Sequence, residues 1–378
     1  MKICYIAPAT PGPEHTQRWI RYFADAGHEV HLIISSDKLS LVGFEKINIH
    51  LLKRFGPHTR TVNYIINSIP LVIQFNRLIK SINPDIIHVH QISDLALLGL
   101  INRFHPLVVT PWGSDVLIAP KKSKISRYIV KNVLKKADLI TCDAEHIKKP
   151  LIELGADPGK IRLIYFGIDT QKFNPGQKDI QIRKELGIPG APIIISSRRL
   201  DSDCDVESLI TAIPLVLKEF PEVIFVIAGV GSQAVKLKEL AKSLGVSESV
   251  KFAGWIPNDE LPNYLTSADI FVSTSLSDAG LAASTAEAMA CGLPVIITDF
   301  GDNRKWVEDG VNGFIVPMRD PHALASRIVY LLQNENERKK FGHVCRQIIE
   351  ERNNWEKEMK KMGTLYEELI EHKNEDRM

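Results

Sequence analysis

Two adjacent arginines lie where a phosphate-binding site could form. Arg198 and Arg199 follow directly after the apolar run at 192–196, which has the pattern of a buried strand. Guanidinium groups match the geometry of phosphate oxygens, and two of them beyond a buried strand are costly to hold without an anion nearby. The alternative is that one arginine pairs with a carboxylate such as Asp201 or Asp203. The pair therefore indicates a phosphate site or a local ion pair.

A second segment, at 273–295, is rich in small residues and passes from strand to glycine-containing loop, helix, turn and strand. Small residues allow a ligand to approach the backbone closely. The helix is expected to start near Gly280 and Leu281, where its positive end could stabilise a diphosphate. Glu287 lies in its first turns, and its carboxylate could accept two hydrogen bonds from a ribose diol. The alternative for Glu287 alone is a solvated helix residue.

A loop of small residues also follows the first expected strand. Gly12 lies in this loop, and His15 lies where the next helix begins. Free backbone N–H groups at such a position can hold an anion, although an ordinary connecting loop would look the same. The loop lacks the pattern G-x-G-x-x-G, so a dinucleotide-binding fold is not indicated.

Apolar strands and amphipathic helices alternate along the whole chain. We expect strands at 2–7, 29–34, 47–51, 85–89, 107–110, 138–141, 161–164, 192–196, 223–228, 250–253, 269–273, 294–298 and 313–316. We expect helices at 15–26, 60–82, 120–136, 144–154, 206–219, 233–244, 258–267, 281–291, 320–333 and 336–372. Continuous apolar strands are typical of parallel sheets that helices cover on both faces. The fold class is therefore α/β. A Gly- and Pro-containing break near 168–190 predicts domains at 1–170 and 171–350, with a C-terminal helix at 351–378 that could cross back to the N-terminal domain.

The composition is that of a soluble globular protein, because 44% of the 378 residues are apolar and 24% are charged. The apolar runs are too short for a signal peptide or a membrane span. Five cysteines lack disulfide or zinc spacing, which favours a cytoplasmic location. Residues 1–170 carry a net charge of +8 and the remainder carries −6, so the first half is the better candidate for meeting an anionic partner.

Motifs along nearly the whole chain resemble those of the retaining glycosyltransferases of family four. The run at 287–295, Glu-Ala-Met-Ala-Cys-Gly-Leu-Pro-Val, resembles the donor-binding signature of that family. Further segments resemble family motifs in the same order, at 27–30, 85–90, 110–115, 166–173, 228–231, 252–256 and 309–314. Each motif alone is weak evidence, but the ordered set is specific.

The resemblance implies two facing Rossmann-like domains, the GT-B architecture. It also implies transfer of a hexose-type sugar from a nucleotide diphosphate donor, with retention at the anomeric carbon. The roles that carry over are ribose binding by Glu287, diphosphate binding by Arg199 or its neighbour Arg198, a flexible phosphate-side loop at Gly12, and backbone contacts to the base at Gly254 and Ile256. The helix start at Gly280 and Leu281 completes the expected donor site, and Arg304 is a further cation for the leaving group.

The chain departs from the family pattern in three places. The usual lysine after the arginine falls on Cys204, and the first of two glutamates falls on Ala279, where the neighbouring Asp278 could substitute. The histidine before Gly113 is Trp112, which resembles a branch of the family with a Trp-Gly-Ser-Asp motif. The candidate catalytic residues are Arg199, Asp278 and His15.

The expected partners are a UDP-sugar donor and an acceptor that is a glycan, a small molecule or a lipid-linked intermediate in polysaccharide or glycolipid biosynthesis. We expect neither a metal nor another cofactor, and no nucleic acid. The segment at 121–136 holds seven cations and no acid, which fits a helix on the inner face of an anionic membrane. A core-packed helix with a solvated basic face is the alternative. The rival functions are a nucleotide-sugar epimerase of the same fold and a catalytically weak nucleotide-sugar-binding protein.

Overall fold

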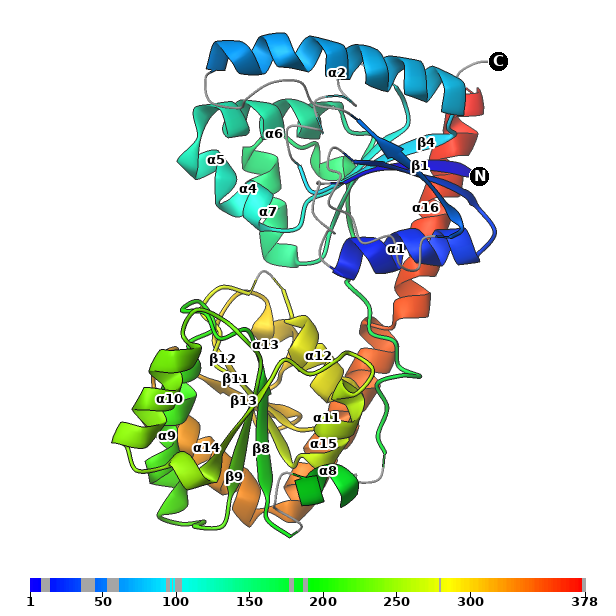
Figure 1. Ribbon diagram of the computed structural model, residues 1–378. Coiled ribbons are helices and arrows are strands. Elements are labelled where there is room, and N and C mark those ends of the chain that lie inside the picture. The colour runs from blue at the N-terminus through cyan, green and yellow to red at the C-terminus, as the bar shows by residue number, and fades with distance from the viewer. Residues whose placement is uncertain are drawn as a thin grey trace. The chain divides into compact units, whose positions relative to one another are not determined.

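A computed structural model describes residues 1–7, 14–34, 45–52, 61–92, 96, 98, 104–176, 180–185, 190–278 and 280–375. Side chains are described at these positions except at 14, 15, 61–69, 180, 181 and 185. The chain divides into two compact units (Figure 1). Unit 1 comprises Met1–Tyr165 and Glu358–Met378, and unit 2 comprises Phe166–Lys357. The expected α/β fold, with parallel sheets flanked by helices, is confirmed.

Unit 1 is built on a seven-stranded parallel sheet with the order β3-β2-β1-β4-β5-β6-β7. Its strands are β1 (Lys2–Ile6), β2 (Glu29–Ile34), β3 (Ile47–Leu51), β4 (Ile86–His90), β5 (Leu107–Thr110), β6 (Leu139–Cys142) and β7 (Ile161–Leu163). The central strands are buried at nearly every position, because helices cover both faces of the sheet.

The helices of unit 1 come from both ends of the chain. They are α1 (Glu14–Asp25), α2 (Thr61–Ile82), α4 (Ser114–Leu117), α5 (Ala119–Lys122), α6 (Lys124–Lys136), α7 (Glu145–Glu153) and most of α16 (Trp355–Glu375), with a 3-10 turn at Pro158–Lys160. The C-terminal α16 packs on the same face of the sheet as α1, since the rings of Phe23 and Tyr366 lie 5.1 Å apart. The last helix is therefore part of the first unit.

Unit 2 is built on a six-stranded parallel sheet with the order β10-β9-β8-β11-β12-β13. Its strands are β8 (Ile193–Ser197), β9 (Ile224–Ala228), β10 (Val250–Gly254), β11 (Ile270–Ser273), β12 (Val295–Thr298) and β13 (Gly313–Val316). The strand order reverses between β8 and β11. In open parallel sheets, ligands bind beyond the carboxyl ends of the strands at such a reversal, so this edge is the place to look for a site.

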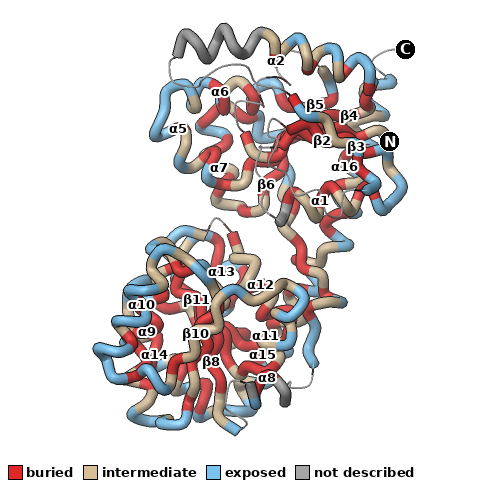
Figure 2. The backbone as a smooth tube through the Cα atoms, in the orientation of Figure 1, coloured by how far each residue is buried: buried red, intermediate tan, exposed pale blue. Residues whose placement is uncertain are grey.

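The helices of unit 2 form two layers. Figure 1 shows α9, α10 and α14 on one face of the sheet, and α8, α11, α12 and α15 on the other. Their bounds are α8 (Ile180–Glu185), α9 (Val206–Leu217), α10 (Ala234–Ser243), α11 (Leu261–Ser267), α12 (Ala283–Ala290), α13 (Asn303–Trp306), α14 (Pro321–Gln333) and α15 (Glu335–Arg352), with a 3-10 turn at Ser247–Ser249. Figure 2 shows buried residues concentrated along the strands, where two apolar clusters fill the spaces between the sheet and each helical layer.

Two helices expected to be continuous are each divided in the structure. The helix at 336–372 is two helices, because the chain leaves helical geometry at Asn353, where the Asn353 carbonyl accepts the N–H of Ile168 at 2.7 Å. The Ile168 carbonyl in turn accepts the N–H of Trp355 at 2.9 Å. The helix at 120–136 is divided at Ser123, where the backbone is extended and the side-chain hydroxyl caps α6 by accepting the N–H of Ser126. No helix among the described residues is both long enough and apolar enough to cross a bilayer.

Candidate functional site

The Arg198 guanidinium lies at the sheet edge of unit 2 where the strand order reverses, between β8 and β11. Arg198 follows β8, and its guanidinium contacts residues that follow β11. Nη2 donates to Asp278 Oδ1 at 2.6 Å and to Ser275 Oγ at 3.1 Å. Only 12% of the Arg198 side chain is exposed. Burial opposes its charge, but the Asp278 carboxylate and the adjacent Cys204 thiol outweigh that effect, and the pKa of Arg198 is raised. Arg198 is therefore a fixed, partly desolvated cation.

The same guanidinium lies at the start of α12. Arg198 Nη1 donates to Ser284 Oγ at 3.2 Å, and Ser284 is in the first turn of that helix. The N-cap residue Ala282 offers no side-chain acceptor, and the first turn contains no acidic residue. A helix N-terminus carries a partial positive charge, so placing an arginine beside it is unfavourable unless an anion is present. Among the described residues, Asp278 is the one carboxylate that pairs with Arg198, so the arrangement suits a second, external anion.

Arg199 differs sharply from its neighbour. Its side chain is 66% exposed, and it donates to Asp201 Oδ2 and Asp203 Oδ2, each at 2.8 Å. This is the local pairing that the sequence left open as an alternative. Exposed ion pairs of this kind are weak, so the Arg199 guanidinium can exchange its partners at little cost. Of the two arginines, Arg198 is therefore the one whose side chain is held at the sheet edge.

The remaining helix residues of the expected site gather on α12 and the loop before it. Gly280 is buried, Leu281 packs against the core beneath the sheet, and Glu287 is half-buried one turn further along α12. Asp278 lies just before them and is the counter-ion of Arg198. Arg198, Asp278 and the α12 start therefore come together. Ala279 lies outside the described residues.

A hollow of about 190 Å³ adjoins the two arginines. Its lining residues come from the ends of β8, β9 and β10 and the start of α11. Ile256 forms part of the wall, together with the exposed indole of Trp255. Gly254, the last residue of β10, has a left-handed backbone with φ of 71° and directs the chain into this wall. Ligand pockets usually measure roughly 300–1,000 Å³, so this hollow suits one flat ring rather than a whole ligand.

The floor of that hollow is made of closely packed backbone. Gly229 donates its N–H to the Gly254 carbonyl at 2.6 Å, and its φ of 149° is one that side chains disfavour. A Cβ at Gly229 would lie 2.0 Å from the Arg198 carbonyl oxygen, and one at Gly231 would lie 2.4 Å from that of Leu200. Glycine is therefore required here, because the loops after β8 and β9 touch.

One predicted site residue, Arg304, lies apart from this group. Arg304, on α13, makes two hydrogen bonds to the Asp299 carboxylate at 2.8 and 2.6 Å and lines a separate hollow beside Arg352. Gly12 lies outside the described residues, and so does the side chain of His15, although its backbone begins α1.

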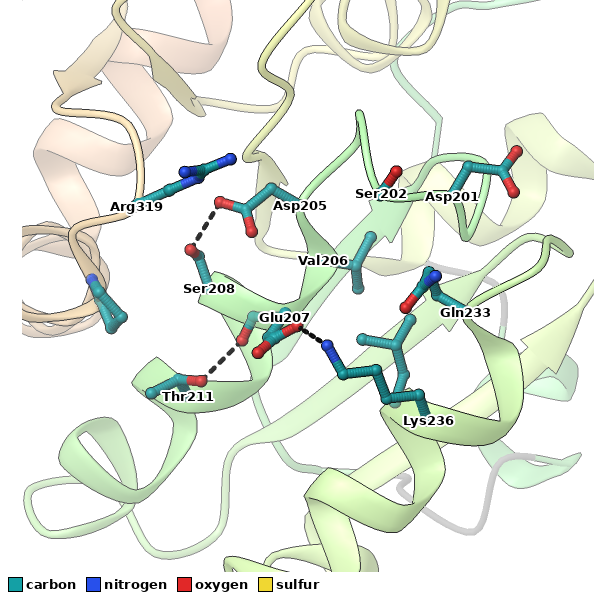
Figure 3. Close-up of a pocket in the computed structure, with 12 residues that line it drawn as sticks. Asp201, Ser202, Asp205, Val206, Glu207, Ser208, Thr211, Gln233, Lys236 and Arg319 are labelled. Carbon is teal, nitrogen blue, oxygen red and sulfur yellow. Dashed lines mark hydrogen bonds and ion pairs between the residues drawn. The ribbon is translucent and has the colours of Figure 1, made fainter.

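A larger hollow, of about 440 Å³, lies on the other side of the loop after β8 (Figure 3). Its polar groups mostly satisfy one another. Glu207 accepts from Lys236 Nζ at 2.6 Å, and Asp205 accepts from Ser208 Oγ at 2.6 Å. Figure 3 shows Arg319 directed toward Asp205, whose pKa is raised by burial although Ser208 and Arg319 oppose that shift. Both lining cations thus face carboxylates of the same hollow, Lys236 at Glu207 and Arg319 at Asp205, so the hollow is less suited to an external anion than the edge at Arg198.

Unit 1 carries its own polar cluster at the carboxyl end of β4. His88 Nδ1 lies 2.5 Å from the Tyr366 hydroxyl of α16, and His88 Nε2 lies 2.7 Å from Thr110 Oγ1. Burial lowers the pKa of His88 far below its ordinary value and that of His90 to about 3, so both rings are neutral. Nearby, Asp115 accepts the N–H of Ile92 at 2.8 Å. Burial raises the pKa of Asp115 to about 6.

Sequence reasoning named no role for several residues that build the site. Ser275 and Ser284 hold the guanidinium of Arg198, and Gly229 lets two loops touch. All three lie in segments whose motifs were recognised, but only contacts between distant strands reveal their partners. Among the described residues, no three His, Cys, Asp or Glu side chains gather as a metal site requires. Unit 2 can therefore bind an anion next to the hollow of about 190 Å³ that accepts a flat ring.

Two family models match the chain. The model "Glycosyl transferases group 1" matches residues 178–347, and "Glycosyl transferase 4-like" matches residues 2–144. The structure of Anabaena HepE in complex with UDP has a TM-score of 0.82 at 20% identity and covers 98% of this chain and 100% of that one. This likeness shows that the two units form a GT-B fold.

Curated relatives match over part of their length. The GDP-mannose-dependent alpha-(1-6)-phosphatidylinositol monomannoside mannosyltransferase of Mycolicibacterium smegmatis is 27% identical over 64% of this chain and 65% of its own. The alpha-monoglucosyldiacylglycerol synthase of Streptococcus pneumoniae is 31% identical over 57% of this chain and 52% of its own. The chain thus matches between half and two thirds of the length of these relatives.

Proposed function

We propose, from the premise that this chain belongs to the glycosyltransferases of family four, that it moves a hexose-type sugar from a nucleoside diphosphate donor to an acceptor with retention. The observation that carries the proposal is a cation, only 12% exposed, at the start of a helix. Arg198 and the free N–H groups of α12 would stabilise the negative charge that develops on the leaving diphosphate. One preorganised donor of this kind is typically worth about 3–4 kcal/mol of barrier.

The neighbouring residues would bind the rest of the donor. Glu287 would hold the ribose hydroxyls, and the backbone at Gly254 and Ile256 would meet the edge of the base. Asp278 pairs with Arg198. Once the donor diphosphate replaces Asp278 as the partner of that guanidinium, the Asp278 carboxylate would face the sugar. From the family resemblance, Gly12 and His15 would contribute from unit 1. We propose a UDP-sugar as the donor, and the UDP bound to HepE supports that choice.

An exposed cationic surface on unit 1 supports an acceptor at an anionic membrane. The cations of α5 and α6 are all exposed, and no acidic residue lies among them. They are Lys121, Lys122, Lys124, Arg127, Lys131, Lys135 and Lys136. The side chains of Ile129, Val130, Val133 and Leu134 face the core, as the alternative interpretation of this segment expected.

Three apolar side chains nevertheless point outward within this cationic surface. Ile118 is 49% exposed, Ile125 is 53% exposed and Tyr128 is 68% exposed. Basic residues that attract anionic lipid, together with apolar residues that insert among the headgroups, are the two components of interfacial binding. Both relatives named above act on lipids, so we propose a lipid-linked or glycan acceptor and a peripheral position at the cytoplasmic face of the membrane.

The donor proposal is tested by calorimetry and by product analysis. Wild-type protein is titrated with UDP, GDP and ADP and then incubated with each matching radiolabelled sugar nucleotide, with and without lipid extract. We expect one nucleotide to bind, and labelled lipid or glycan to form with an α-to-α or β-to-β outcome. Donor binding with no transfer to any acceptor would favour a binding protein. An epimerised sugar formed without acceptor would favour an epimerase.

The membrane proposal has its own test. Co-sedimentation is measured with vesicles of pure phosphatidylcholine and with vesicles containing phosphatidylglycerol. We expect binding to the anionic vesicles only, and we expect Arg127→Glu with Lys131→Glu to abolish it. The matched control is Lys218→Glu with Lys242→Glu, which reverses two exposed charges on unit 2. Absence of wild-type binding at low salt would contradict the membrane proposal.

A further inference from the structure

The indole of Trp255 is exposed beside the hollow next to the arginines. Of its surface, 69% is accessible, whereas the other four tryptophans are buried or half-buried. A large apolar ring left in water at a concave site usually marks a binding surface. Trp255 follows Gly254, whose left-handed backbone ends β10, so the ring stands at the rim of the sheet edge where the site lies.

The hollow has an apolar side and a cationic side. Val230, Ile256 and Leu261 line the apolar side together with Trp255, and Val230 is itself 57% exposed. Both arginines, Arg198 and Arg199, line the hollow as well. The volume of about 190 Å³ would accept one flat ring, with a phosphate-binding cation within reach. These are the requirements of a nucleobase joined through a ribose to a diphosphate.

The walls differ in their freedom to move. Gly229 is packed against the Arg198 carbonyl and hydrogen-bonded to Gly254, so the floor is fixed backbone. The Trp255 side chain is exposed, so it can turn about its χ angles to meet a ring. A fixed floor with one movable aromatic wall accommodates a base of either size.

We propose that Trp255 is the surface on which the nucleobase of the donor stacks. This rests on the proposed function and adds to it a residue that supplies affinity without selecting the base. Every base has a π face, so stacking on an aromatic side chain tolerates purines and pyrimidines alike. Discrimination between bases would then come from the backbone at Ile256, which we place at the edge of the base. Loss of the indole should weaken all nucleoside diphosphates by a similar factor.

The test compares Trp255→Ala and Trp255→Phe with wild-type protein by calorimetry, using UDP, GDP and inorganic pyrophosphate. The matched control is Val235→Ala, which removes an equally exposed apolar side chain from α10. We expect Trp255→Ala to lose about 5- to 150-fold in affinity for whichever nucleotide binds, as alanine replacement of a stacking aromatic typically does. Trp255→Phe and Val235→Ala should stay within about threefold of wild type.

Pyrophosphate separates stacking from a structural effect, because it has no base. We expect its affinity to be the same in all variants, and nucleotide binding to quench tryptophan fluorescence in wild type but not in Trp255→Phe. Equal nucleotide affinity in wild type and Trp255→Ala would overturn the stacking proposal and leave the donor proposal standing. An equal loss for pyrophosphate and nucleotide in Trp255→Ala would also overturn it. A wild-type protein that binds no nucleoside diphosphate would overturn both.

Discussion

Arg198 Nη2 and Asp278 Oδ1 lie 2.6 Å apart in an ion pair whose two side chains are 12% and 19% exposed. The pair joins the loops after β8 and β11, the two strands between which the sheet order reverses. Because the guanidinium also lies at the positive end of α12, the Asp278 carboxylate stands where an incoming phosphate would bind. Under the proposed function, an anionic donor would compete with this carboxylate for the same guanidinium.

The first prediction separates the two arginines. Arg198→Ala should lower donor turnover by about 100-fold or more, because it removes a preorganised cation from a partly desolvated site. Arg199→Ala should lower it by less than about tenfold, because that guanidinium is exposed and already paired with Asp201 and Asp203. Steady-state kinetics with the labelled donor measures both.

Loss of Arg198 leaves the partly buried Asp278 carboxylate unpaired, which lowers stability by itself, so the double variant Arg198→Ala with Asp278→Asn serves as the control. It should melt near the wild-type temperature and remain as inactive as the single variant. A larger loss in Arg199→Ala than in Arg198→Ala would contradict the assignment and favour Arg199, the other residue that the family resemblance offers for this role.

This difference between neighbours shows where sequence reasoning stops. Continuous apolar runs identified the buried strands, and the order of strands and loops placed Arg198 and Arg199 at the correct sheet edge. Successive side chains point in different directions, however, and the sequence does not say which one faces α12. That choice depends on Ser275 and Ser284, which lie about 80 positions along the chain from Arg198.

The sequence also failed to predict some short helices and the interruption of a long one. The four-residue helices α4 and α13 are too short to show a 3.6-residue period. The break at Asn353 lies within a charged amphipathic pattern that continues on both sides. It is set by backbone pairing with Ile168, which is nearly 200 residues away in the chain and leaves no local signal.

The second prediction concerns Asp278→Asn. Removing the negative charge frees the guanidinium of Arg198, so UDP should bind about three- to tenfold more tightly in calorimetry, corresponding to roughly 1 kcal/mol. Turnover should fall, because Asp278 is the carboxylate that we place beside the transferred sugar. Unchanged turnover with tighter binding would show that Asp278 acts only as a counter-ion. Weaker UDP binding would contradict the competition described above.

The third prediction tests the backbone contact beneath the ring-sized hollow. Gly229→Ala should lower the melting temperature by several degrees and abolish nucleotide binding, since its Cβ would meet the Arg198 carbonyl at 2.0 Å. Overpacking together with a disfavoured φ typically costs about 2–4 kcal/mol. Gly190→Ala is the matched control, because no atom lies within 4 Å of its added Cβ. It should change the melting temperature little, and a similar fall in both variants would contradict this interpretation.

The fourth prediction follows from Asp115, whose pKa is raised by burial from 3.8 to about 6 although backbone N–H groups oppose the shift. The folded protein holds this proton more tightly than the unfolded chain. The resulting stabilisation is complete below pH 4 and is lost as the pH rises through 6, with a total of about 3 kcal/mol.

Asp115→Asn cannot titrate, so it isolates this contribution from all other groups. Melting temperatures of wild type and variant are compared between pH 4 and pH 7. The advantage of wild type over the variant should be largest at the acidic end, shrink up to pH 6 and then level off. A constant difference across that range would contradict a raised pKa at Asp115.

The last prediction concerns the attachment of the C-terminal helix to unit 1. The Tyr366 hydroxyl on α16 lies 2.5 Å from His88 Nδ1 and 3.2 Å from the Tyr5 hydroxyl. Tyr366→Phe leaves the buried Nδ1 of a neutral histidine without that partner, which should cost about 1–3 kcal/mol. Tyr5→Phe removes only the longer contact and should cost less than about 1 kcal/mol. The melting temperature should therefore be highest for wild type, lower for Tyr5→Phe and lowest for Tyr366→Phe. The reverse order of the two variants would show that the hydrogen bond to His88 is not what holds α16 in place.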